Sequence, residues 1–134
     1  MGGGLMGRIL LYDGKELQEI DINLEWQEMV KAIGCDYMDI VTRKIGGKWF
    51  DIVCDDEFLL WEEPSLEWVT VMDAGMRQTI LMGSVLFTKS NDEGETMPLS
   101  DEDIKTIKGA LTDVFVMEYG GHGAMIKAVI VEPL

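Results

Sequence analysis

Apolar residues recur along the chain with two periods, and the shorter period predicts strands joined in hairpins. Short apolar runs and polar–apolar alternation indicate strands, and glycine-rich turns between them indicate hairpins. Asp13-Gly14 is a hairpin turn of this kind, and Gly83 inside the longest run indicates a bulge. The expected strands cover residues 8–12, 16–22, 37–43, 48–54, 68–72, 79–88, 112–119 and 124–132.

Two segments follow the helical period instead. Between residues 24 and 33, apolar side chains are spaced i, i+3, i+4, i+7, with Asn23 as the expected N-cap and Gly34 as the stop. A second helix is expected after Ser100, where three acidic residues fill the first turn and favour the positive end of the helix dipole. The expected apolar stripes are Trp26, Met29, Val30 and Ile33 in the first helix, and Ile104, Ile107 and Leu111 in the second.

The order of these elements predicts one α+β domain over residues 1–134. Consecutive hairpins favour a mainly antiparallel sheet with two helices packed on it. We expect residues 1–7 to form a flexible, tag-like start and residues 89–98 to form an exposed, mobile loop. The expected core of the second hairpin consists of Ile40, Val41, Trp49, Phe50, Ile52 and Val53.

The order of several short motifs resembles the family of domains of unknown function 3846, over roughly residues 8–107. The resemblance implies a small domain of a phage, plasmid or other mobile element, and it supplies no catalytic residues. The stretch 60–65 departs from the family pattern, and the hairpin after Leu111 resembles an addition to it. The motifs are Glu19-Ile20-Asp21 before the first helix, Tyr37–Val41, Asp51–Glu57, Met82–Phe87, Asp92–Glu95 and Leu99–Ile104.

Composition changes this picture mainly through charge. The chain has 25 acidic and 11 basic residues, for a formal net charge of −14. A field of that sign repels nucleic acid and anionic membranes and attracts basic protein surfaces. No apolar run approaches the roughly 20 residues that span a bilayer. The sequence therefore predicts a cytoplasmic protein that binds neither nucleic acid nor membranes directly, and it leaves the oligomeric state open.

No pattern typical of an active site appears, so we expect no catalytic residue, metal or cofactor. His122, the only histidine, lies in the turn Gly120–Gly123, where an exposed turn residue is the plainer interpretation. Cys35 and Cys54 are expected to be small buried hydrophobic residues. Asp55–Glu57 lacks the spacing of a calcium loop and is interpreted as a solvated turn. Trp61 and Trp68 flank an irregular segment, and one of them could be an exposed interface anchor.

Acidic residues between positions 89 and 103, together with a second acidic group, are the candidate binding surface. Carboxylates in a row imitate the phosphates of a duplex. We therefore expect a non-enzymatic, counter-defence interaction protein of a mobile element that inhibits a host nucleic-acid-binding or defence protein, as a nucleic-acid mimic. The alternative is a protein that sequesters a nucleotide signal. The candidate partner-binding residues are Asp92, Glu93, Glu95, Asp101, Glu102, Asp103, Glu62 and Glu63.

Overall fold

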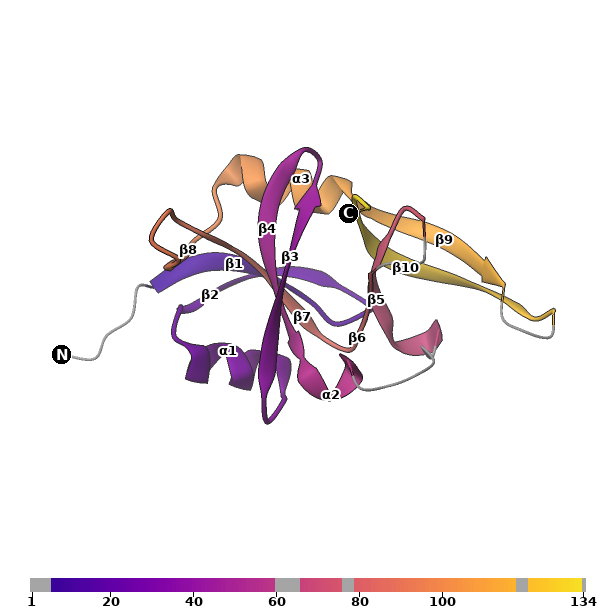
Figure 1. Ribbon diagram of the computed structural model, residues 1–134, viewed down its shortest axis with the longest axis horizontal. Helices are drawn as coiled ribbons and strands as arrows, with labels where there is room; N and C mark the ends of the chain where they lie inside the picture. The colour runs from indigo at the N-terminus through magenta and orange to yellow at the C-terminus, as the bar shows by residue number, and fades with distance from the viewer. Residues whose placement is uncertain (1–5, 60–65, 76–78, 118–120, 134) are drawn as a thin grey trace.

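The computed structural model contains two β-sheets (Figure 1). Side chains of both sheets meet in one hydrophobic core. It describes residues 6–59, 66–75, 79–117 and 121–133. Buried residues of both sheets join in this core, including Leu10 and Phe87 of the first sheet and Val71 and Val129 of the second. The expected α+β class with mainly antiparallel strands is confirmed, although the strands form two sheets rather than one.

The larger sheet has the strand order β2-β1-β7-β4-β3, with β8 paired to β7. Its central strand β7 is antiparallel to β1 and to β4, so it lies between two hairpins from earlier in the chain. This place explains why its first four residues are all buried. The bounds are β1 Met6–Tyr12, β2 Leu17–Asn23, β3 Met38–Ile45, β4 Lys48–Asp55, β7 Val85–Ser90 and β8 Thr96–Met97.

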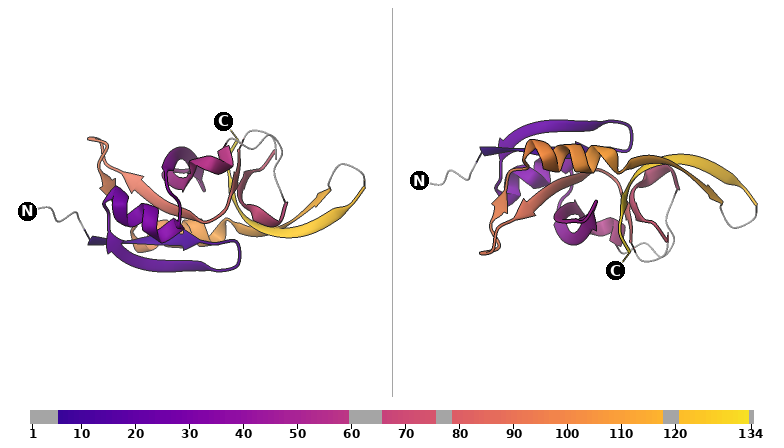
Figure 2. Two further views of the ribbon diagram at one scale, coloured as in Figure 1. Left: turned by 90° about the horizontal axis from the view of Figure 1, so that it is seen from below. Right: turned by 90° about the horizontal axis from the view of Figure 1, so that it is seen from above.

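The smaller sheet has the order β6-β5-β10-β9. Strands β10 and β5 run parallel, whereas the other pairs of this sheet are antiparallel. The hairpin of β9 and β10 projects beyond the rest of the molecule (Figures 1 and 2). Its strands confirm the expected closing hairpin. The bounds are β5 Val69–Asp73, β6 Ile80–Met82, β9 Leu111–Met117 and β10 Gly123–Val131.

Helices cover both faces of the larger sheet. Helix α1 packs on one face, where Met29 joins a cluster with Val53 and Leu86. Helix α3 packs on the opposite face through Ile104 and Ile107. Two further short helices follow β4, where the sequence indicated an acidic turn and an irregular segment. The bounds are α1 Trp26–Ile33, α2 Asp56–Leu59, the 3-10 helix η1 Leu66–Trp68 and α3 Asp101–Gly109.

The long strand expected over residues 79–88 is in fact two strands that belong to different sheets. Gly83 separates β6 from β7 with a φ of +76°, a left-handed conformation that favours glycine. A Cβ at this position would lie 2.5 Å from the ring of Phe58. The expected bulge at Gly83 is therefore a crossing point at which the chain passes from the smaller sheet to the larger one.

Three side chains expected in the core are exposed instead. Trp26 lies in the first turn of α1, and Leu24, just before the helix, is buried against Met29 in its place. Phe50 and Ile52 of β4 face the core, but Trp49 points to the other face, where Lys44 Nζ lies 5.3 Å from the centre of its ring. Ile40 lies on the outer strand β3 and is also exposed. Helix α1 begins after Glu25, and the expected cap Asn23 is the last residue of β2.

Candidate interaction surface

The first turn of α3 carries three of the predicted partner-binding residues, and one of them completes a helix cap. The Ser100 hydroxyl accepts a hydrogen bond from the Asp103 backbone N–H at 3.1 Å, and the Ser100 N–H donates to Asp103 Oδ2 at 2.9 Å. This reciprocal capping box satisfies two backbone donors that the helix itself cannot pair. The predicted cap at Ser100 is confirmed, and Asp103 is buried by it.

Two lysines from the larger sheet also bind Asp103. Lys89 Nζ lies 2.6 Å from Asp103 Oδ2, and Lys48 Nζ lies 3.7 Å from Asp103 Oδ1 and 3.1 Å from Glu102 Oε1. Burial alone would raise the pKa of Asp103. The hydrogen bonds from Lys89 and from the backbone and hydroxyl of Ser100 outweigh it and lower the pKa to about 2. Asp103 is therefore an internal anion, and its charge is not presented to a partner.

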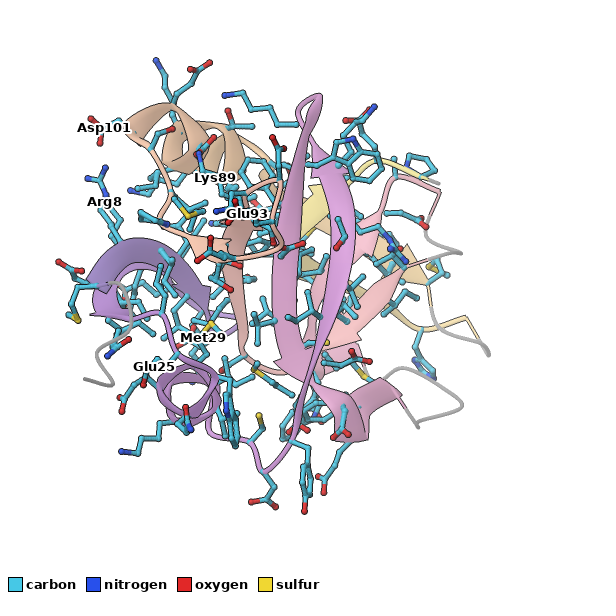
Figure 3. The ribbon with its side chains drawn as sticks, turned by 60° about the vertical axis from the view of Figure 1, so that its left-hand side comes forward. Arg8, Glu25, Met29, Lys89, Glu93 and Asp101 are labelled. Atoms are coloured by element: carbon cyan, nitrogen blue, oxygen red, sulfur yellow. The ribbon has the colours of Figure 1, made fainter. Side chains whose placement is uncertain are left out.

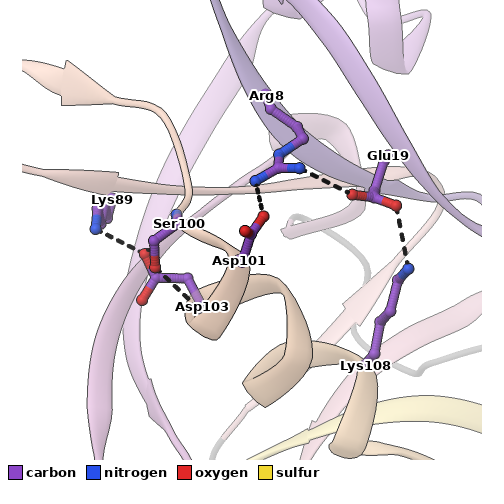
Figure 4. A network of polar contacts seen from close by, with 7 residues as sticks. All are labelled: Arg8, Glu19, Lys89, Ser100, Asp101, Asp103 and Lys108. Carbon is purple, nitrogen blue, oxygen red and sulfur yellow. Dashed lines mark hydrogen bonds and ion pairs between the residues drawn. The ribbon is translucent and has the colours of Figure 1, made fainter.

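Asp101 is also paired within the molecule (Figure 4). Arg8 on β1 donates to Asp101, and its other terminal nitrogen lies 3.6 Å from Glu19 Oε1. Lys108, near the end of α3, lies 3.3 Å from Glu19 Oε2. Cations from β1, β4 and β7 thus neutralise the whole first turn of α3, although Asp101 and Glu102 remain on the surface.

The segment Asn91–Glu95, which we call the acidic turn, joins β7 to β8 and has a different environment. Figure 3 labels Glu93 of this turn and Asp101 of α3. The Asn91 side-chain oxygen accepts from the backbone N–H groups of Glu93 and Glu95, both at 2.9 Å, and its amide donates to Glu95 Oε1 at 3.1 Å. The expected mobile loop is therefore a tight turn closed by one asparagine. Asp92, Glu93 and Glu95 are exposed, and within the described residues none of them has an ion pair.

A second group of carboxylates lies at the open end of the β3–β4 hairpin, and we call it the hairpin-end cluster. The register places Asp39 opposite Cys54 and Met38 opposite Asp55, and the Asp56 N–H donates to the Tyr37 carbonyl. No described Lys or Arg pairs with these carboxylates. The ring of Tyr37 is 73% exposed among them. The cluster consists of Asp36, Asp39, Asp55, Asp56 and Glu57 around Tyr37.

Sequence reasoning singled out three of the five carboxylates of this cluster. It interpreted Asp55–Glu57 as a solvated turn and gave no role in a site to Asp36 or Asp39. Their proximity depends on the register of β3 against β4, which the glycine turn between these strands fixes. The predicted site residues Glu62 and Glu63 lie outside the described residues, as does Trp61.

Other candidate chemistry has little support in the part of the chain that the structure describes. His122 is exposed and has no hydrogen bond there to a serine or cysteine. Burial first, and then neighbouring carboxylates, raise the pKa of Cys54 to about 12, which makes its thiol a poor nucleophile. Cys35 is half-buried rather than buried. No three His, Cys, Asp or Glu side chains of the described ranges are grouped as metal ligands, and no helix there is long and apolar enough to cross a membrane.

A site for an anionic ligand would need several cations in one place. Arg8, Lys48 and Lys89 do converge on the start of α3, but each is already paired with a carboxylate. Arg43 instead donates to the Thr79 hydroxyl at 2.8 Å, and Lys44 stacks on Trp49. Within the described residues, these cations leave little positive charge for a nucleotide.

One known protein family matches most of this chain. The sequence model described as "Domain of unknown function (DUF3846)" matches residues 6–112. The chain belongs to this family. Comparisons with curated proteins and with solved structures gave no match. The family match ends just after β9 begins, so most of the β9–β10 hairpin lies outside it, and the resemblance noted from the sequence is confirmed.

Proposed function

We propose that this DUF3846 protein is a non-enzymatic interaction protein that binds a partner with a basic surface through its acidic turn. The observation that carries the proposal is the contrast between two acidic segments. The carboxylates of α3 are paired with cations of the same chain, whereas Asp92, Glu93 and Glu95 have no described cation partner. Unpaired charges on an ordered turn are the ones that a partner can neutralise.

The partner that fits this charge is a protein that itself binds nucleic acid. Such proteins present lysines and arginines to phosphates, and a row of fixed carboxylates competes for the same side chains. We propose a host nuclease or another nucleic-acid-binding defence factor, which the protein would inhibit in the cytoplasm as a counter-defence protein of a phage or mobile element. The exposed ring of Tyr37 and its surrounding carboxylates offer a second contact for the same partner.

The test is capture of partners from a host lysate at low and moderate salt, with matched charge-reversal variants. The double variant Asp92→Lys/Glu93→Lys reverses two charges and leaves the hydrogen bonds between Asn91 and Glu95 in place. The control is Glu16→Lys/Asp21→Lys, an equal change of charge at two exposed residues beside the first hairpin. Glu19 is unsuitable as a control because it pairs with Arg8 and Lys108.

The proposal predicts that a basic protein is captured by the wild type and by the control but is lost from the acidic-turn variant. Capture should weaken with salt, because the Debye length is only ~8 Å at physiological ionic strength. Equal capture by both variants would contradict a role for the acidic turn. The variant Asp36→Lys/Asp39→Lys tests separately whether the same partner also contacts the hairpin-end cluster.

A further inference from the structure

The projecting hairpin of β9 and β10 has a buried apolar face and, beyond the exposed pair of Asp113 and Lys127, exposed apolar side chains on the other face. Its inner face packs on the smaller sheet, where Val116 and Ala128 are buried with Met72 and Met82. We call the opposite face the outer face, and the register shows which residues lie on it. Met125 lies opposite Phe115, and Gly123 lies opposite Met117. The exposed fractions of Phe115, Met117 and Met125 are 59%, 58% and 65%.

The outer face is ordered rather than loosely attached. The ring of Phe115 lies against Gly123, whose missing side chain leaves room for it. At the base of the hairpin, the buried Tyr12 hydroxyl of the larger sheet donates to the Lys127 carbonyl. The three apolar side chains therefore lie on a ribbon that is anchored to the larger sheet and already has a packed inner face.

Strand β9 is also the edge of its sheet. Among the described residues it pairs only with β10, and it contains no proline, lysine or bulge, with Asp113 as its one charged residue. The Ile130 N–H donates to the Ala110 carbonyl at 3.0 Å, which fixes the phase of the ladder. Every second residue of an antiparallel strand directs its backbone N–H and C=O groups away from the partner strand. Because Ala110 faces β10, the residues of β9 that face away from β10 are Leu111, Asp113, Phe115 and Met117.

The distribution of charge indicates which molecule pairs with this edge strand. Of the 25 acidic and 11 basic residues, only Asp113, Glu118 and Lys127 lie between positions 111 and 131. Two molecules with a net charge of −14 repel each other over most of their surfaces, but this hairpin is nearly neutral. Because it projects from the body, contact between two hairpins keeps the two acidic bodies apart (Figure 2).

We propose that β9 pairs antiparallel with β9 of a second copy of the chain, which joins the two smaller sheets across a two-fold axis. Such an axis keeps equivalent faces on the same side, so Phe115, Met117 and Met125 of both copies form one apolar stripe. The contact is smaller than a standard interface of about 1,600 Å², so the dimer is weak and depends on concentration. This surface is distinct from the acidic turn.

The response to salt distinguishes this dimer from a complex with a basic partner. Screening relieves the repulsion between two acidic copies, so dimerisation strengthens as salt rises. Binding of a basic protein to the acidic turn weakens under the same change. A failure of one proposal therefore leaves the other intact.

The test is analytical ultracentrifugation of the wild type and three variants over a range of concentration at low and high salt. Phe115→Lys/Met125→Lys places charge on the outer face. Trp26→Lys/Trp49→Lys is the matched control, because these side chains are similarly exposed, at 58% and 57%, but lie elsewhere. Asp113→Pro removes one outward N–H, keeps the three apolar side chains and leaves the pairing with β10 untouched.

We expect the outer-face variant and Asp113→Pro to dimerise at least about tenfold more weakly than the wild type, and the control to dimerise as the wild type does. Unchanged circular dichroism would show that the hairpin is still folded. If Asp113→Pro does not fold, the outer-face variant decides alone. A wild type that stays monomeric, a dimer that survives both variants, or a dimer that weakens with salt would overturn the proposal and leave the edge to a strand of another protein.

Discussion

The first turn of α3 and the acidic turn both contain three carboxylates within five residues, but the fold treats them differently. Asp103 is buried, completes the capping box with Ser100 and binds Lys89 and Lys48. Asp92 is exposed on a turn that is closed by Asn91, and no described cation reaches it. The two segments look alike in the sequence because the cations that pair with α3, and not with the acidic turn, come from strands outside both segments. Net charge therefore overstates the charge that is available to a partner.

The largest effect is expected for Asp103→Ala, which removes the side-chain half of the capping box and leaves Lys89 without its closest carboxylate. We expect a loss of about 2 kcal/mol in the free energy of unfolding, because the contacts of Asp103 lower its pKa to about 2 and each pKa unit corresponds to about 1.4 kcal/mol. Urea unfolding measures this loss. Asp92→Ala serves as the control, and an equal loss in both variants would remove the distinction between the two segments.

The pH dependence of the unfolding free energy should show the contribution of Asp103. Asp103 has a pKa of about 2 in the folded protein, below the value of about 3.9 expected when unfolded. A lowered pKa stabilises the fold fully above the unfolded value, and this stabilisation is lost as pH falls from about 5 towards 2. The loss amounts to about 2 kcal/mol. Asp103→Ala should lack this part of the pH dependence, and identical pH profiles for the two proteins would contradict it.

A smaller effect is expected for Arg8→Gln. Arg8 bridges Asp101 and Glu19, but both of its ion pairs are on the surface. Such pairs contribute ~0.2–1 kcal/mol each and are screened by salt. The decrease in unfolding free energy should therefore be measurable at low salt and shrink at high salt. Lys15→Gln, at an exposed lysine without an ion pair among the described residues, is the control and should show no such dependence.

The smallest effect on folding is expected for Asp92→Lys/Glu93→Lys. These side chains are exposed, and the hydrogen bonds that close the turn come from Asn91. The urea midpoint should stay at the wild-type value. A clear loss of stability would show that the two carboxylates have a structural role, as those of α3 do.

Local features of the fold were predictable from the sequence, and distant ones were not. The Ser100 cap depends on a spacing of three residues, and the glycine turn between β3 and β4 fixes a hairpin, so both were found. The position of β7 between β1 and β4 has no local signal in the sequence. This strand order brings Arg8, Lys48 and Lys89 to the start of α3. The exposure of Trp26 and Trp49 was not predicted. Periodicity shows on which face of a helix or strand a residue lies, but it does not show how far the neighbouring element that packs on this face extends.

The most direct measurement of the central claim is the association rate with a captured basic partner as a function of ionic strength. It compares the wild type, Asp92→Lys/Glu93→Lys and Asp101→Lys/Glu102→Lys. We predict that the acidic-turn variant associates slowly and loses most of its salt dependence without losing stability, whereas the α3 variant loses stability and keeps most of its association rate. Wild-type association of the acidic-turn variant, or a larger loss in the α3 variant, would contradict the claim that the acidic turn holds the available charge.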